Sequence, residues 1–137
     1  MSLDYGVDIP FVDHLGMTLE HFDGGESTLQ LLPRPEHRNS HDVVHGGVVM
    51  TLLDVALATA ARSVDPGMGV VTIEMKTSFM RPAPADEAHA LVGHGKLLHR
   101  TRSLAFVEGS VLDAQGQLCA HATGTFKYVP STAPQQG

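Results

Sequence analysis

The chain has 137 residues, of which 42% are hydrophobic and 18% charged, and this balance predicts one folded domain and excludes a long disordered chain. Its formal net charge of -6 disfavours a nucleic-acid partner, because phosphate contacts need a basic surface. A single cysteine, Cys119, excludes an intramolecular disulfide and suits a reducing compartment. No signal segment is evident at the N-terminus, and the longest apolar run carries Asp54 at its middle, so we expect a cytoplasmic protein that does not enter a membrane.

Apolar periodicity and turn residues predict two strands, one long helix and then four strands. A short helix at 10–15 precedes strands at 17–22 and 27–32, which the turn Asp23-Gly24-Gly25 joins. Apolar residues cover nearly every face of the long helix at 46–62, which indicates burial nearly all round. Strands follow at 70–80, 88–98, 103–112 and 117–128, with a hairpin turn at 113–116.

This order favours an α+β fold in which an antiparallel sheet curls around one helix, since a parallel sheet needs more crossover helices than the chain offers. We therefore predict a single domain at 1–130. The tail at 131–137 lacks apolar anchors and is expected to be disordered. In the strand at 70–80, alternation places Ile73, Met75 and Thr77 on one face, and Thr72 and Glu74 on the opposite face.

Asp54 is the only charged residue between His45 and Arg62. Placing a carboxylate on an apolar helix costs several kcal/mol, so another group or a function must offset that cost. A catalytic acid and an acid hydrogen-bonded to a neighbouring chain end explain this position equally well.

Gly46 and Gly47 lie at the start of the same helix, where backbone amides have no internal acceptor and the helix dipole is positive. A substrate oxygen can approach such a bare amide, although a glycine pair also serves ordinary tight turns. Gly46 and Asp54 are about 12 Å apart along a helix, at 1.5 Å per residue. If both act on one carbonyl, they must come from two copies of the chain.

A cluster of basic residues lies around the connection between the predicted strands at 88–98 and 103–112: Lys96, His99, Arg100 and Arg102. This cluster could receive the phosphates of a nucleotide-bearing ligand, or it could form a solvated loop. His41 and His45 superficially match a zinc-protease motif. That motif needs a glutamate base and a helix beneath both histidines, and neither is expected here. We therefore predict no metal, and we expect Cys119 to be a buried structural thiol.

The segment at 39–54 reads NSHDVVHGGVVMTLLD and resembles the signature of PaaI-like hotdog acyl-CoA thioesterases, which combines an Asn, a His-Gly-Gly and an acid eight residues after the first glycine. The segments at 71–82 and 113–126 are similar to that family's next strand and closing hairpin. The resemblance covers about residues 10–129. One departure is Thr101-Arg102, where many relatives have Gly-Arg.

The resemblance implies a hotdog fold and hydrolysis of an aryl or short- to medium-chain acyl-CoA, without any cofactor beyond the coenzyme A of the substrate. Asp54 would act as general base or nucleophile, and the Gly46 amide would polarise the thioester carbonyl. Asn39 would position the thioester or water, and Thr72 would orient the water or the partner subunit's acid. His45, Gly47, Arg100 and Arg102 would help to bind the substrate. The family also implies an active site formed by a homodimer, commonly paired into a homotetramer.

Two other functions fit the same fold. One is a noncatalytic module that binds acyl-CoA, against which the retention of Asp54 argues. The other is a hydratase or dehydratase, which needs a pairing of histidine and acid that the sequence does not offer.

Overall fold

The computed structural model describes residues 3–131, so the predicted tail lies outside the described residues except for Ser131. The described elements are α1 (Pro10–Leu15), β1 (Met17–Asp23), β2 (Glu26–Leu31), the 3-10 turn η1 (Pro35–His37), α2 (Gly46–Arg62), β3 (Met68–Phe79), β4 (Leu91–Arg100), β5 (Leu104–Leu112) and β6 (Leu118–Pro130). The predicted order of elements is confirmed. Strand bounds differ from the predicted ones by one to three residues.

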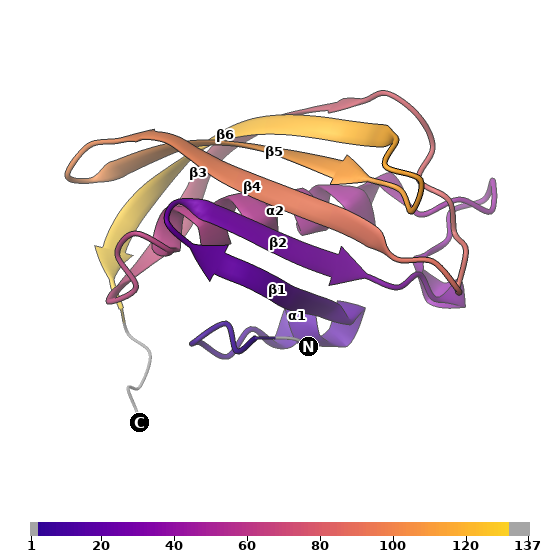
Figure 1. The fold of residues 1–137 in the computed structure, drawn as a ribbon, viewed down its shortest axis with the longest axis horizontal. Coiled ribbons are helices and arrows are strands. Elements are labelled where there is room, and N and C mark those ends of the chain that lie inside the picture. The colour runs from indigo at the N-terminus through magenta and orange to yellow at the C-terminus, as the bar shows by residue number, and fades with distance from the viewer. Residues whose placement is uncertain (1–2, 132–137) are drawn as a thin grey trace.

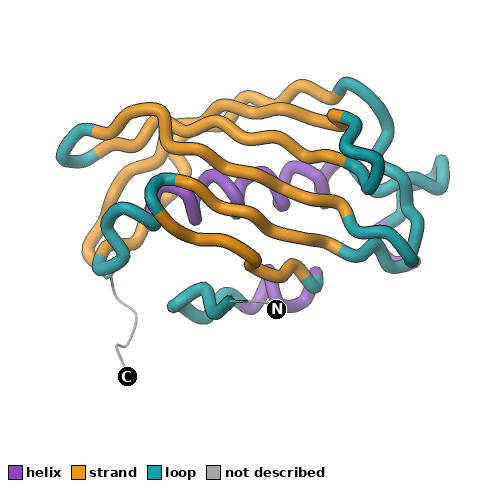
Figure 2. Tube along the Cα trace, viewed as in Figure 1, coloured by secondary structure: helices purple, strands orange, loops and turns teal. Residues whose placement is uncertain are grey.

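Six strands form one antiparallel sheet in the order β1-β2-β4-β5-β6-β3. The sheet curls around α2, and α1 lies beside β1 near the N-terminus (Figure 1). In the tube view the single long helix lies behind the strands (Figure 2). This architecture is the predicted α+β hotdog fold.

Local sequence explains the turns that hold the sheet in register. Gly24 and Gly25 both have positive φ, at 61° and 86°, and form the two-residue hairpin between β1 and β2. At the β5–β6 hairpin, Asp113 accepts hydrogen bonds on one carboxylate oxygen from the amides of Gln115 and Gln117.

The core lies between α2 and the concave face of the sheet. Leu52, Leu53 and Leu57 of α2 are fully buried there, against strand residues such as Leu29 and Phe126. Glycine lets the helix approach closely. A Cβ atom on Gly95 would lie 2.2 Å from the Ala56 carbonyl oxygen, so no side chain fits at that position.

The prediction that α2 is buried nearly all round is wrong for the single chain. Gly47 and Met50 are exposed, and Thr51, Asp54 and Ala58 are half-buried on the same stripe of the helix. This stripe is the less apolar side of the helix, since it carries Thr51 and Asp54, whereas the sheet-facing side carries Leu52, Leu53 and Leu57.

The predicted face of Thr72 is also wrong. A β-bulge between Thr72 and Glu74 leaves Ile73 unpaired, while Thr72 pairs with the buried Phe126. The extra residue reverses the alternation, so Thr72 faces α2 and Ile73 is 55% exposed.

Candidate active site

Asp54 and Thr72 are in direct contact. The Thr72 hydroxyl donates a hydrogen bond of 2.8 Å to Oδ1 of Asp54 in the same chain. Asp54 is half-buried on the open stripe of α2, and β3 brings Thr72 across to it. One carboxylate oxygen is thereby fixed, and the Asp54 side chain borders a cavity. The structure thus pairs Thr72 with the acid of its own chain.

The start of α2 presents one free amide. His45 caps the helix: its ring Nδ1 accepts from the Gly47 amide at 2.8 Å, and its carbonyl accepts from Val48 and Val49. Among the described residues, the Gly46 amide alone in this turn has no acceptor. The ring nitrogen of His45 and the amide of Gly47 are therefore engaged in the cap, and the Gly46 amide is the available donor.

The two glycines of this turn differ in the space around them. A Cβ atom on Gly47 would lie 3.1 Å from Nδ1 of His45, where the capping ring sits. A Cβ atom on Gly46 would meet the Phe79 ring at 3.6 Å. A side chain at Gly47 would therefore press on the capping ring, whereas a methyl group at Gly46 would make only van der Waals contact with Phe79.

Asn39 organises the loop that leads to this turn. Its Oδ1 accepts hydrogen bonds from the amides of His41 (2.9 Å) and Val43 (3.2 Å), which closes an Asx turn. Its side-chain NH₂ group is the part of the amide that these contacts leave for a ligand. Asn39 also lines the same cavity as Gly46, so the loop brings the two predicted residues together.

The predicted site residues Asn39 and Gly46 line one cavity, and Asp54 lines another. The first, here the Gly46 cavity, has a volume of about 630 Å³ and includes Arg81 and His41. Its other lining residues are Asn39, Val43, Val44, Gly46, Val49, Phe79, Met80, Pro82, Ala83 and Cys119. The second, here the Asp54 cavity, has a volume of about 350 Å³ and is lined by Ile9, Phe11, Val12, Met50, Thr51, Asp54, Val55 and Met75. The two site groups of one chain therefore open into different cavities, as their separation along α2 requires.

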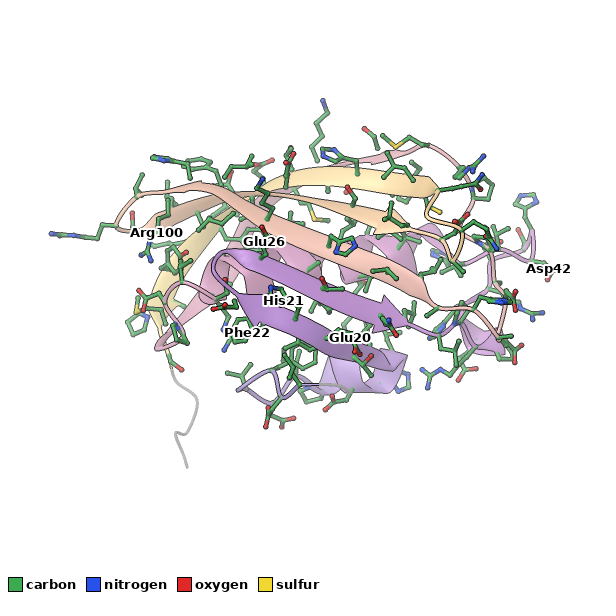
Figure 3. The ribbon with its side chains drawn as sticks, in the orientation of Figure 1. Glu20, His21, Phe22, Glu26, Asp42 and Arg100 are labelled. Carbon is green, nitrogen blue, oxygen red and sulfur yellow. The ribbon has the colours of Figure 1, made fainter. Side chains whose placement is uncertain are left out.

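The predicted basic cluster lies at the far end of the sheet. Arg100 is near one end of the molecule, whereas Asp42, in the loop before α2, is at the other (Figure 3). The Arg100 guanidinium lies 4.1 Å from the centre of the Tyr128 ring and 3.6 Å from an oxygen of Asp65. Arg102 is exposed in the turn that follows β4. Within one chain, neither arginine is brought to Gly46 or Asp54.

The sequence analysis missed Arg81 and Phe11 as site residues. Arg81 lies two residues after the end of β3 and far from the His-Gly-Gly turn in the sequence, so only the folded chain shows that it lines the Gly46 cavity. Phe11 belongs to α1, whose sequence carries no catalytic motif, so only the folded chain shows that it borders the Asp54 cavity.

The Cys119 thiol is buried and its pKa is raised by that burial, which confirms the structural thiol and opposes a nucleophilic role. Within residues 3–131, no group of three or more His, Cys, Asp or Glu side chains is placed to hold a metal ion. No helix in the same range is long and apolar enough to cross a membrane.

Comparison with known proteins agrees with this fold. The Thioesterase superfamily profile matches residues 41–120. Human acyl-coenzyme A thioesterase 13 is 27% identical over 110 residues, which cover 80% of this chain and 77% of the human one. Among solved structures, the Escherichia coli PaaI protein of the phenylacetic acid degradation operon has a TM-score of 0.83 at 22% identity, over 91% of this chain and 88% of that one.

A mutant form of the phenylacetic acid degradation protein PaaI from Thermus thermophilus has a TM-score of 0.78 at 27% identity, over 87% of this chain and 98% of that one. The chain belongs to the thioesterase superfamily, as a thioester hydrolase with the PaaI-like hotdog fold.

Proposed function

We propose that the protein hydrolyses an acyl-CoA to a free acid and coenzyme A, at a site that Gly46 of one chain and Asp54 of another form together. The observation that carries the proposal is the pair of groups that the fold leaves available. They are a carboxylate oriented by Thr72 and a helix-terminal amide without an acceptor in the described chain. A thioester needs a base or nucleophile and a donor for its carbonyl oxygen, and these groups supply both.

The roles of the site residues follow from their contacts. The Gly46 amide donates to the thioester oxygen, and the charge that develops there is favoured by the positive end of α2. The Asn39 NH₂ group donates to the thioester or to the attacking water. Asp54 removes a proton from that water, or attacks the carbonyl itself to form a mixed anhydride. In rapid-quench mass spectrometry, an acyl adduct on Asp54 would identify the anhydride route.

His45 and Gly47 hold this donor in place through the helix cap. Arg102 is exposed and charged, and we assign it to the CoA phosphates together with Arg100, both supplied by a neighbouring chain. The reaction needs no metal or organic cofactor, because a thioester is already an activated acyl donor.

The open faces of the chain support a dimer. Strand β3 is a 12-residue edge of the sheet, and its Val71, Ile73 and Phe79 side chains are 47%, 55% and 53% exposed. On α2 beside it, Met50 is 39% exposed. An unpaired edge strand next to exposed apolar side chains is a typical surface for a second copy.

A charge on this edge tests the dimer. Ile73→Lys should give a folded monomer with little hydrolysis, because a lysine on an edge strand opposes pairing. Leu98→Lys is the matched control, since Leu98 is 54% exposed on β4, away from this edge. A monomeric wild type with full activity would exclude the shared site.

The hydrolysis itself is tested by thiol release from aryl, short-chain and medium-chain acyl-CoAs. Asp54→Asn should lower kcat by about a hundredfold or more, the scale of an acid–base residue. Asp23→Asn, in the β1–β2 turn outside both cavities, should leave it unchanged. Binding of acyl-CoA without thiol release by the wild type would instead identify a noncatalytic binding module.

A further inference from the structure

The lining of the Asp54 cavity is apolar apart from two residues. Six of its eight lining side chains are hydrophobic: Ile9, Phe11, Val12, Met50, Val55 and Met75. The polar members are Asp54, which carries the only charge of the lining, and Thr51, whose hydroxyl donates to the Gly47 carbonyl at 2.8 Å. A ligand group with a negative charge would therefore meet no cation of this chain in the cavity lining.

The Gly46 cavity also has a mainly apolar lining, but it carries basic residues that the Asp54 cavity lacks. Arg81 and His41 line it, together with the Asn39 amide and the Gly46 turn. An acyl-CoA is likewise unequal at its two ends, since the coenzyme carries the phosphates and the acyl group is mostly hydrocarbon. Charge complementarity therefore matches the coenzyme arm to the Gly46 cavity and the acyl arm to the Asp54 cavity.

Helix α1 places an aromatic ring at the border of the Asp54 cavity. Its Val12 is 1% exposed and anchors the helix in the core, whereas the neighbouring Phe11 is 59% exposed. Pro10 begins the helix, and Gly16, with φ of 81°, caps it by donating to the Val12 and Asp13 carbonyls. The Phe11 ring therefore lies on a short helix that is fixed at both ends. This suits a rigid wall of the Asp54 cavity more than a mobile lid.

We infer that the Asp54 cavity holds the acyl group, that it selects uncharged apolar acyl groups, and that Phe11 sets the length it accepts. This inference rests on the proposed thioesterase function and adds its substrate class. The two methionines, Met50 and Met75, are flexible and adapt to different chains, while the rigid Phe11 ring limits how far a chain extends. Phe11 is thus a specificity-determining residue that no catalytic motif contains.

The first experiment compares hexanoyl-CoA with adipoyl-CoA, which has the same chain length with a terminal carboxylate. The wild type should show kcat/KM about a hundredfold lower for adipoyl-CoA, since the carboxylate is left without a partner in the cavity. Equal values for the two substrates would overturn the inference. Failure to hydrolyse any thioester would instead overturn the proposed function, so the two failures are distinguishable.

The second experiment measures the ratio of kcat/KM for decanoyl-CoA over hexanoyl-CoA in Phe11→Ala, Phe11→Leu and the wild type. Removing the ring should raise the ratio about tenfold or more, and leucine should give an intermediate ratio. Leu32→Ala is the matched control, because Leu32 is 52% exposed but lies outside both cavities. A ratio that Phe11→Ala leaves unchanged, with hydrolysis intact, would refute the role of Phe11.

Discussion

The Thr72 hydroxyl on the edge strand β3 donates a hydrogen bond to Asp54 on α2 and links the two elements at the site. Thr72→Val keeps the shape of the side chain and removes the donor. We expect kcat to fall about tenfold or more with KM nearly unchanged, because a hydrogen bond to a charged group contributes about 1.5–3 kcal/mol. Steady-state thiol release measures both constants.

Thr72→Ser keeps the hydroxyl and is the control, so it should retain most of the activity. A valine variant as active as the serine variant would show that the Asp54 carboxylate is oriented by other means.

The His45 cap leads to a second prediction. His45→Ala removes the acceptor of the Gly47 amide, so it should destabilise the protein by about 0.5–2 kcal/mol and lower kcat by loosening the turn that carries Gly46. Urea denaturation and thiol release measure the two effects. Asn is a preferred N-cap residue, so His45→Asn should restore most of the stability and activity. If His45→Asn is as impaired in activity as His45→Ala while its stability is restored, the ring has a role beyond the cap.

The sequence predicted the elements because their signals are local. The two glycines after Asp23, the proline of α1 and the acid in an apolar helix each act within a few residues. Gly46 and Asp54 were assigned correctly to one helix for the same reason. Features that depend on distant partners could not be predicted. The bulge at Ile73 depends on the register with β6, and the Arg100 contacts depend on Asp65 and Tyr128, which are remote in the chain.

Buried His37 predicts how stability depends on pH. Its Nδ1 accepts from the Arg34 amide at 3.0 Å. Burial first, and then the nearby Arg34 charge, lower the pKa of His37 below its usual value of about 6.5. The unfolded chain therefore binds a proton at a higher pH than the folded chain. The contribution of His37 to stability is complete above about pH 6.5 and is lost as the pH falls below it.

Urea denaturation at pH 7.5 and 5.5 measures this effect. At pH 7.5, His37→Gln should be less stable than the wild type by about 1–3 kcal/mol, the cost of a disturbed buried hydrogen bond. The difference should shrink at pH 5.5. His21→Gln is the control, because His21 is exposed on β1 and its replacement leaves the core unchanged. A constant difference between the two pH values would contradict the assignment.

The close approach of α2 to the sheet predicts a large cost at Gly95. A Cβ atom there would lie 2.2 Å from the Ala56 carbonyl oxygen and 2.8 Å from Oγ of Ser27, so helix and strand must separate. Gly95→Ala should lower the free energy of unfolding by about 1–3 kcal/mol or more. Denaturant titration checks this, with Gly67→Ala as control, because nothing lies within 4 Å of a Cβ atom on Gly67. Equal stabilities of the two variants would contradict the tight contact.

The bulge in β3 also determines where the chain tolerates the loss of a residue. Deleting one residue from a strand usually turns all the preceding side chains to the opposite face. Ile73 is the exception, because it is the surplus residue between two correctly paired neighbours. Without it, Thr72 and Glu74 would follow one another in ordinary alternation, with Thr72 still directed at Asp54. Natural length variation in this strand is therefore compatible with the site at position 73, where the loss of a residue leaves every neighbouring side chain on its present face.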